Sequence, residues 1–600
     1  MIIKLEPREY YKDQVNNYTS ILSKTKSKIR KVSLARLLVF IITTIGIYIA
    51  VANKIPILAM LLGLGYIVFI YLVRAHLLLE KKKQWNQALL IINNDELSLL
   101  DGKTNGRETG EEYLSSSHPY NEDLDVFGRK SLYQLINRSA TACGRIKLAE
   151  TLNNLISDVK ELKLRQKAVS ELIDKPQWRQ YFQATGHLVK ESSEDQKGLI
   201  AWSKNYEKRF NKIFFKIMLI INPLMGIGVI TLIQLNIFTY STFFLFLLLP
   251  MSIIGTRLGI LNKIHIDVSK KSSLLLKYAE LFKIISKEDF ESVLITDIQR
   301  KINGKPSAQL AVRKLAKITK SMDYRLNMLV GFFLNIFFLW DIRQAIRIEN
   351  WKSKYGVYID EWFSQLSKID ELQSFAGFAF NFPNSIFPDF TEDDFQVTGT
   401  NVKHPFISSD ESVGNPINID DWKQFQIITG ANMAGKSTYL RTVGINMLLA
   451  STGSVVLADN FSLRPTNIFT GIKTTDSLQD GESYFFAELK RLKELIHRLE
   501  RGEQLFIILD EVLRGTNSAD KQKGSMALIT QLIRLKASGI IATHDLALGD
   551  LIIDFPENIK NKRFEVEISN NELVFDYKLK EGISQNLNAT FLMKKMGITL

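Results

Sequence analysis

The stretch Gln426-Ile-Ile-Thr-Gly-Ala-Asn-Met-Ala-Gly-Lys-Ser437 decides the fold of the C-terminal part of this 600-residue chain. A run of strand length, residues 426–429, leads into the pattern G-x-x-x-x-G-K-S, and a helical segment follows from Thr438. In this context the glycines let backbone N–H groups turn toward phosphate oxygens, and the start of the helix favours negative charge. The stretch therefore predicts a P-loop that binds a nucleotide.

Individual roles follow from the chemistry of a P-loop. Lys436 is expected to reach the β- and γ-phosphates and to act in catalysis, and the Ser437 hydroxyl is expected to ligate Mg²⁺. ATP and Mg²⁺ are therefore the expected ligands. The residues expected to bind the nucleotide here are Gly430, Ala431, Asn432, Met433, Ala434, Gly435, Lys436, Ser437 and Thr438.

Two further apolar runs, residues 505–509 and 539–542, complete the predicted site. The first ends in Asp510 and Glu511, and the second is followed by His544. Ligands bind at the carboxyl ends of strands in open α/β sheets. Asp510 is expected to hold Mg²⁺ through water, Glu511 to polarise the attacking water, and His544 to contact the γ-phosphate. Alternation of such strands with helical segments predicts a parallel α/β domain over residues 395–600.

Four other runs, residues 37–52, 55–73, 217–235 and 238–254, are almost entirely apolar. A membrane helix needs about 20 such residues, so the runs predict two transmembrane hairpins. Positive residues stay in the cytoplasm, which predicts a multi-pass protein of the bacterial inner membrane with its ATPase domain inside. The flanking basic residues are Lys24, Lys26, Lys28, Arg30, Lys31, Arg36, Arg74, Lys81, Lys82, Lys83, Arg209, Lys212, Lys216, Arg257 and Lys263.

A fifth apolar stretch, residues 326–340, has only 15 residues and is followed by Asp341. Its length favours a helix in the core of a soluble domain over a membrane span. The rest of the chain before residue 395 contains helical patterns. The expected organisation is a basic segment (1–33), hairpin 1 (34–74), a helical region (75–210), hairpin 2 (211–260), a helical lever (261–394) and the ATPase domain (395–600).

Composition narrows the classes of function. The formal charge is +14, which favours nucleic acid or anionic lipid as a partner, although basic loops beside a membrane account for part of it. Cys143 is the one cysteine, which excludes a disulfide framework and any zinc or iron–sulfur site built from several cysteines.

The segments TGANMAGKSTYLRTVGINMLLASTGSVVLA, DGESYFFAELKRL, LDEVLRGTNSAD and IATHDLAL together resemble the ATPase domain of the MutS mismatch-repair family. The resemblance begins at Lys403-His404-Pro405 and ends near the C-terminus. Upstream, residues 124–128, residues 137–144 and the segment WFSQLSKIDELQSFAGFAF resemble the helical core domain of that family. The resemblance implies a homodimer with composite ATP sites that binds DNA.

Family roles map onto residues beyond the P-loop. Ser483 matches the serine that the family presents to the nucleotide of the partner subunit, and Arg514, Gly515, Thr516 and Asp520 match a loop that faces the dimer. The family's aromatic residue that stacks on adenine falls near Ser412, which is not aromatic. Tyr577 is the expected substitute.

Departures from the family limit the expected DNA chemistry. In the family, a mismatch-reading domain precedes the core and inserts an aromatic residue into the DNA duplex. Residues 1–120 hold hairpin 1 and too few polar residues for such a domain. The triplet Phe390-Thr-Glu392 lies at the wrong place in the chain to supply that aromatic residue. No nuclease domain and no C-terminal dimerisation extension are expected after the ATPase. DNA binding is therefore expected through phosphates, without specificity for a mismatch.

Two other interpretations remain open. One is an ABC-transporter-like machine, against which stand the four spans, their separation by a cytosolic segment and the absence of an L-S-G-G-Q signature. The other retains the ATPase and replaces DNA with a protein or envelope partner.

Overall fold

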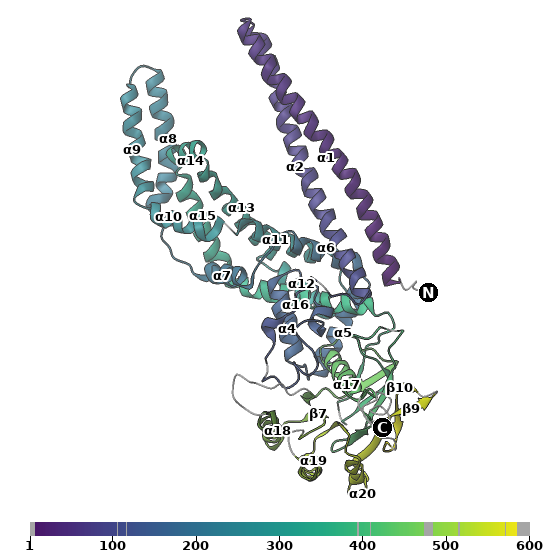
Figure 1. Ribbon diagram of the computed structural model, residues 1–600. Coiled ribbons are helices and arrows are strands. Elements are labelled where there is room, and N and C mark those ends of the chain that lie inside the picture. The colour runs from purple at the N-terminus through teal and green to yellow at the C-terminus, as the bar shows by residue number, and fades with distance from the viewer. Residues whose placement is uncertain are drawn as a thin grey trace.

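The computed structural model describes residues 6–104, 106–115, 117–269, 271–392, 395–408, 410–431, 433–472, 484–513, 517–569 and 572–584. An α/β domain lies at one end, a helical domain covers it, and two helical arms diverge from the helical domain (Figure 1). The expected order, mostly helical first and α/β last, is confirmed.

The first arm is a hairpin of two very long helices, α1 (Pro7–Ala52) and α2 (Pro56–Leu100). At 1.5 Å per residue the 46 residues of α1 extend about 70 Å. Residues 33 and 74, where the sequence suggested domain boundaries, both lie inside these continuous helices. The apolar halves of the two helices thus form the far end of a hairpin whose polar halves reach back to the helical domain.

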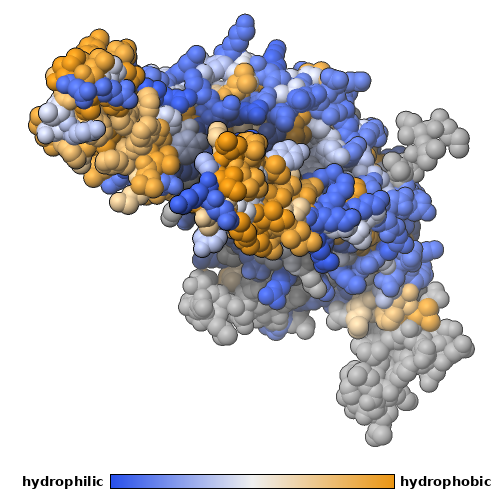
Figure 2. Space-filling view, turned by 90° about the horizontal axis from the view of Figure 1, so that it is seen from above, coloured by the Kyte–Doolittle hydropathy of each residue, from blue (hydrophilic) through white to orange (hydrophobic). Residues whose placement is uncertain are grey.

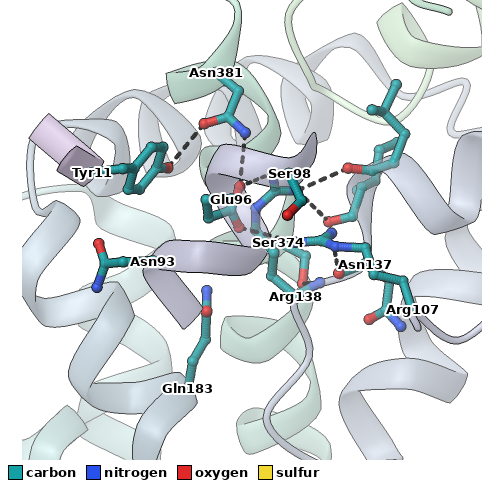
Figure 3. A network of polar contacts seen from close by, with 12 residues as sticks. Tyr11, Asn93, Glu96, Ser98, Arg107, Asn137, Arg138, Gln183, Ser374 and Asn381 are labelled. Carbon is teal, nitrogen blue, oxygen red and sulfur yellow. Dashed lines mark hydrogen bonds and ion pairs between the residues drawn. The ribbon is translucent and has the colours of Figure 1, made fainter. Parts of the chain in front are cut away.

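A buried polar network fastens the base of this arm (Figure 3). Glu96 of α2 accepts hydrogen bonds from Arg138 at 2.7 Å, Arg107 at 3.1 Å and Asn381 at 2.7 Å. Asn381 in turn accepts a hydrogen bond from the Tyr11 hydroxyl of α1 at 2.9 Å. Burial by itself raises the pKa of Glu96, but the charges of Arg138 and Arg107 outweigh it and lower that pKa to about 2. Both helices of the arm are therefore tied to one point of the helical domain.

The second arm carries hairpin 2, formed by α8 (Ile213–Gln234) and α9 (Tyr240–Gly255). Both hairpins lie at the end of the molecule opposite the α/β domain (Figure 1). Seen from that end, the two arms carry separate hydrophobic regions within a largely hydrophilic surface (Figure 2). The other helices of this arm are α10 (Leu258–Ser269), α13 (Ala308–Met322), the 3₁₀ turn η2 (Asp323–Leu326), α14 (Met328–Phe338) and α15 (Trp340–Tyr355).

Among the residues that the structure describes, three helices (α1, α2 and α8) are long and apolar enough to cross a membrane, by length and composition. The number rises to five if two bent pairs each count as one span, α9 with α10 across a 57° bend, and α14 with the helices that follow it across a 76° bend. The apolar windows of α1, α2 and α8 are only 11%, 0% and 17% buried. These surfaces are exposed in the folded chain.

The prediction of a core helix at residues 326–340 is wrong. A helix forms there as α14, but Met328 and Leu329 are 86% and 82% exposed, and only Gly331 and Ile336 are buried. The helix packs on α8 and α9 at the side of hairpin 2. The length of the apolar stretch could not reveal this exposure, because a short apolar helix has the same sequence pattern in a soluble core and beside another apolar helix.

The helical domain surrounds α16 (Ile359–Asn381), whose residues are nearly all buried. Asp370 of α16 accepts hydrogen bonds from the backbone N–H groups of Ala140 and Thr141 just before α4, so α16 holds the start of that helix. The remaining elements are η1 (Glu111–Tyr113), α3 (Leu132–Ile136), α4 (Ala142–Asn153), α5 (Val159–Ile173), α6 (Pro176–His187), α7 (Ser193–Lys204), α11 (Ser272–Lys287), α12 (Val293–Asn303) and η3 (Gly356–Tyr358).

The α/β domain contains two sheets. The larger has the order β10-β9-β4-β8-β7-β6, and all its strands are parallel except β10. The predicted parallel sheet is confirmed, whereas the smaller sheet, of order β1-β5-β2-β3, was not predicted. The strands are β1 (Asp389–Phe390), β2 (Val397–Val402), β3 (Asn415–Ile419), β4 (Phe425–Thr429), β5 (Asn460–Leu463), β6 (Asn467–Gly471), β7 (Leu505–Asp510), β8 (Ser538–Thr543), β9 (Ile559–Ser569) and β10 (Glu572–Glu581). The helices are α17 (Lys436–Ala450), α18 (Tyr484–Glu500), α19 (Ser518–Arg534), η4 (Leu546–Asp550) and α20 (Leu551–Asp554).

Arginine side chains join the two domains. Arg491 of α18 pairs with the fully buried Asp123 at 2.9 Å, and Arg441 of α17 pairs with Asp125 at 3.2 Å. Arg165 of α5 pairs with Glu371 of α16 and also donates to the Thr452 carbonyl, just past the end of α17, at 2.7 Å. The helix that follows the P-loop and the residues just after it therefore contact the helical domain at two points.

Candidate nucleotide site

The P-loop leaves the carboxyl end of β4, whose five residues are all buried. Gly430 has φ of +152°, and a Cβ there would lie 2.6 Å from the Phe564 carbonyl oxygen of β9. Gly435 has φ of +106° immediately before α17. Side chains at these two positions would be strained or would clash, so glycine is required for the loop to turn between β4 and α17.

Lys436 is 4% exposed and folds back onto its own loop. Its Nζ donates to the carbonyl oxygens of Gly430 at 2.7 Å and Ala431 at 3.0 Å. These are neutral acceptors, and a phosphate oxygen is a stronger partner for an ammonium group. The lysine is therefore already positioned at the loop that a phosphate would enter.

The Ser437 hydroxyl donates to the Asp510 carboxylate at 2.5 Å, which brings the two expected metal ligands together. Mg²⁺ prefers hard oxygen donors and usually keeps several waters while taking one or two protein ligands and phosphate oxygens. This hydroxyl and carboxylate fit that pattern. Among the residues with described placement there is no group of three or more His, Cys, Asp or Glu side chains that would hold a metal without a nucleotide.

Glu511 and His544 meet at the ends of β7 and β8. The His544 Nε2 forms an ion pair with the Glu511 carboxylate, while Nδ1 lies 2.9 Å from the Gly430 carbonyl oxygen and 3.3 Å from the Lys436 Nζ. The histidine thus links the acid expected to orient water with the phosphate loop.

The backbone after β7 is strained. Glu511 and Leu513 have φ of +50° and +61°, in the left-handed region that side chains rarely adopt. The Glu511 N–H donates to the Ala542 carbonyl of β8 at 2.9 Å, and the Leu513 N–H donates to the buried Glu488 carboxylate of α18 at 2.6 Å. Strain held by such contacts aims the Glu511 side chain back across the sheet edge toward the P-loop.

A cavity of about 760 Å³ opens in front of these groups. Its volume is within the usual range for a small-molecule site. Its lining includes nine residues of the predicted site: Ala431, Met433, Gly435, Lys436, Ser437, Thr438, Asp510, Glu511 and Tyr577. The other lining residues are Val402, His404, Ile407, Glu411, Ser412, Val413, Asn415, Tyr439 and Thr442.

Tyr577 lines this cavity from β10 and is 44% exposed. It lies at φ of +52° where the β9–β10 register shifts. The Asn415 side chain holds the shift by donating to the Tyr577 carbonyl at 2.9 Å and accepting from the Leu579 N–H at 2.8 Å. Ser412, where the family has an aromatic residue, lines the same cavity. Tyr577, its expected substitute, therefore lies in the same pocket.

Several site predictions lie outside the described residues, namely Asn432, Ser483, Arg514, Gly515 and Thr516. Asp520 is described. Its backbone N–H donates at 2.9 Å to the Asn517 side chain, which caps α19, and its carboxylate accepts from the Asn517 amide at 2.7 Å.

Sequence reasoning missed Asn415, Glu488 and His404 as residues of the site. Glu488 lies within the quoted segment DGESYFFAELKRL, and His404 follows Lys403 at the start of the resemblance. Burial lowers the pKa of His404 to about 4, so this ring lines the cavity as a neutral group. Asn415 had no signal in the sequence, because its role depends on an irregularity in a strand more than 160 residues away.

Comparison with known proteins agrees with this geometry. Residues 426–594 match the family model described as MutS domain V. The chain is 33% identical over 248 residues to DNA mismatch repair protein MutS of Thermotoga maritima, covering 41% of this chain and 30% of that protein. It is 32% identical over 230 residues to MutS protein homolog 4 of Homo sapiens, covering 37% and 24% respectively.

The chain therefore spans only 24% to 30% of the length of these relatives. The match covers the P-loop, the two acids after β7 and His544, which are the residues that the fold brings together around the cavity. Residues 426–594 are therefore similar to MutS domain V, the ATPase domain of that family.

Proposed function

We propose that the whole chain is a membrane-tethered ATPase of the MutS family without the mismatch-recognition domain. It binds ATP with Mg²⁺ and uses hydrolysis to move its helical arms. The observation that carries the proposal is the convergence of Lys436, Ser437, Asp510, Glu511 and His544 at one sheet edge beside a cavity of about 760 Å³.

In this function each group exchanges an internal partner for the nucleotide. Lys436 leaves two carbonyl oxygens for phosphate oxygens, and the Ser437–Asp510 pair opens to hold Mg²⁺. The metal neutralises charge on the phosphates. Glu511 leaves His544 and orients the attacking water, while His544 remains within reach of the phosphate loop.

The test of this activity is ATP turnover by the full chain in detergent. Lys436→Ala should abolish tight ATP binding and turnover, because it removes the cation that meets the phosphates. Lys493→Ala, at an exposed position on α18, is the matched control and should leave both unchanged. Equal turnover by the Lys436→Ala protein and the parent would overturn the assignment.

The active form in this proposal is a homodimer in which Ser483 completes the site of the partner. Mixing Lys436→Ala and Ser483→Ala subunits should give heterodimers with one intact composite site and measurable turnover. Activity no higher than the average of the two separate homodimers would contradict shared sites.

Tethering rests on both apolar hairpins crossing the bacterial inner membrane, with four helices, the termini inside and the ATPase domain in the cytoplasm. The support is their exposure, their common end of the molecule and their basic flanks. In a Cys143→Ala background, a cysteine at Thr239 should react with an impermeant thiol reagent outside intact cells, and one at Ser27 should not. The reverse pattern would invert the topology.

DNA is the proposed partner of the helical part. Exposed basic residues line one face of α13 with no acidic residue in that helix: Arg313, Lys314, Lys317 and Lys320. Such a stripe suits a phosphate backbone, and contacts to phosphates carry no sequence information directly. Binding should weaken steeply with salt, and matched and mismatched duplexes should compete within about 10-fold of each other.

Replacing the four basic residues of α13 by glutamine should lower the salt slope by about 1 for each phosphate that is no longer neutralised. Glutamines at Lys160, Lys163 and Lys167, exposed on α5, provide a control that also removes positive charge. An unchanged slope would exclude α13 as the DNA-binding surface, and absence of binding at low salt would favour a protein or envelope partner.

A further inference from the structure

Helix α14 has the composition of a membrane segment without its length. Its 11 residues, Met-Leu-Val-Gly-Phe-Phe-Leu-Asn-Ile-Phe-Phe, include no charged side chain. Large apolar side chains protrude from it: Met328 is 86% exposed, Leu329 82%, and Phe332 and Phe333 55% each. A soluble surface seldom leaves so many neighbouring apolar side chains in water.

The buried side of α14 packs against the middle of hairpin 2 rather than against its base. The ring of Phe337 lies 6.1 Å from that of Phe246, in the middle of α9. A Cβ on Gly226, in the middle of α8, would lie 3.0 Å from Phe337, so this glycine permits the close approach. The C-terminal end of α14 therefore reaches the depth of the central residues of both hairpin helices.

At that depth α14 breaks. Leu339 adopts φ of +45°, and the chain turns by 76° into the helices that follow. The break releases the carbonyl oxygens of Ile336 and Phe337, which accept hydrogen bonds from the Asn222 amide of α8 at 2.7 and 3.1 Å. Asn222 is fully buried in the apolar middle of α8. In a bilayer, a broken helix is tolerated only where neighbours satisfy the released backbone groups, which Asn222 does here.

The charges that flank α14 are neutralised by each other. Arg325 lies three residues before the helix and Asp341 three residues after it, and their side chains pair at 3.3 Å. The same guanidinium donates to the Leu261 carbonyl at 3.3 Å and to the Asn262 side chain at 2.7 Å. Asp341 is 2% exposed. The two charges nearest to the apolar helix are therefore held as a pair against the start of α10.

From these observations we propose that α14 is embedded among lipid acyl chains as a re-entrant half-helix, the third membrane element of the second arm. The proposal rests on the membrane insertion of hairpin 2 put forward above. Lipid is the occupant because the exposed face of α14 continues the exposed apolar faces of α8 and α9, with which it packs. The bilayer then covers α8, α9 and α14 together.

The test is the environment of a fluorophore attached to single cysteines in the full-length Cys143→Ala protein, reconstituted in phosphatidylcholine–phosphatidylglycerol vesicles. Leu329→Cys and Phe333→Cys report on α14. Leu245→Cys on α9 is the control for lipid, and Leu310→Cys on α13 is the control for water, since both of these leucines are 66% exposed. Quenching is measured with nitroxide-labelled lipids and with aqueous iodide.

Both α14 positions should behave like residue 245, with strong quenching by nitroxide lipid and at least about fivefold weaker iodide quenching than residue 310. Iodide quenching of both positions at the level of residue 310, with residue 245 still in lipid, would overturn the inference and leave the hairpin topology intact. Iodide quenching at residue 245 as well would overturn the inference and the proposed topology together.

Discussion

Two carboxylates of this chain have side-chain partners in opposite settings. Glu96, at the base of the first arm, is buried among Arg138, Arg107 and Asn381, at distances of 2.7 to 3.1 Å. Glu511 pairs with His544 at the wall of a cavity large enough for a nucleotide. In the first setting no ligand can reach the carboxylate. In the second, an incoming phosphate can take over the partners, so the surroundings, rather than the residue type, separate a structural acid from a reactive one.

The largest expected effect comes from Glu511→Gln. The amide cannot accept a proton from water, so ATP turnover should fall by on the order of 10²-fold or more, whereas ATP binding and thermal unfolding should change little. Turnover is measured under saturating ATP, and binding with a fluorescent analogue. Unchanged turnover would remove Glu511 from the reaction.

The same substitution at Glu96 should have the opposite profile. Glu96→Gln leaves the buried Arg138 without its anion, a change that typically costs about 3–5 kcal/mol of stability. Turnover per folded molecule should remain within about twofold of the parent. Thermal unfolding in detergent measures the loss, and Glu9→Gln at an exposed position of α1 is the control. A Glu96→Gln protein with parental stability but little turnover would contradict the structural role assigned to Glu96.

The pH dependence of the unfolding temperature tests whether the charge of Glu96 stabilises the fold. The pKa of Glu96 in the folded chain, about 2, lies below its ordinary value of 4.5. The ionised carboxylate therefore stabilises the fold above pH 4.5, and this contribution is lost as the pH falls from about 4.5 to about 2. The difference in unfolding temperature between the parent and Glu96→Gln should shrink over that interval. A difference that is constant with pH would show that lost packing, not charge, destabilises the variant.

A smaller effect is expected at the mouth of the cavity. Tyr577→Ala removes the ring expected to stack on adenine, worth about 1 kcal/mol, so the Kd for ATP should rise roughly fivefold. Tyr577→Phe retains the stacking ring and should bind like the parent. If GTP and ATP lose affinity equally, the ring contacts the base without selecting it, and if neither changes, the base lies elsewhere.

The parts of the nucleotide site that could be predicted from the sequence are those marked by a short local pattern. The P-loop, the acids after β7 and His544 each follow a short apolar strand, and parallel strands bring their carboxyl ends to one edge. Asn415 and Glu488 act through backbone groups of segments distant in sequence, and no periodicity marks such partners. The assignment of residues 326–340 as a core helix failed for a related reason: the surface against which α14 packs is itself an apolar hairpin more than 70 residues earlier.

The network around Glu96 also has a consequence for how the protein is made. Synthesis runs from the N-terminus, so Tyr11 and Glu96 emerge 370 and 285 residues before Asn381, which joins them. Both the second hairpin and the rest of the second arm are synthesised between Glu96 and Asn381. Arg107 and Arg138 can pair with Glu96 earlier, but the link through Asn381 to Tyr11 forms only after α16 is made. A ribosome stalled before residue 381 should expose this base to proteases, and one stalled beyond α16 should protect it.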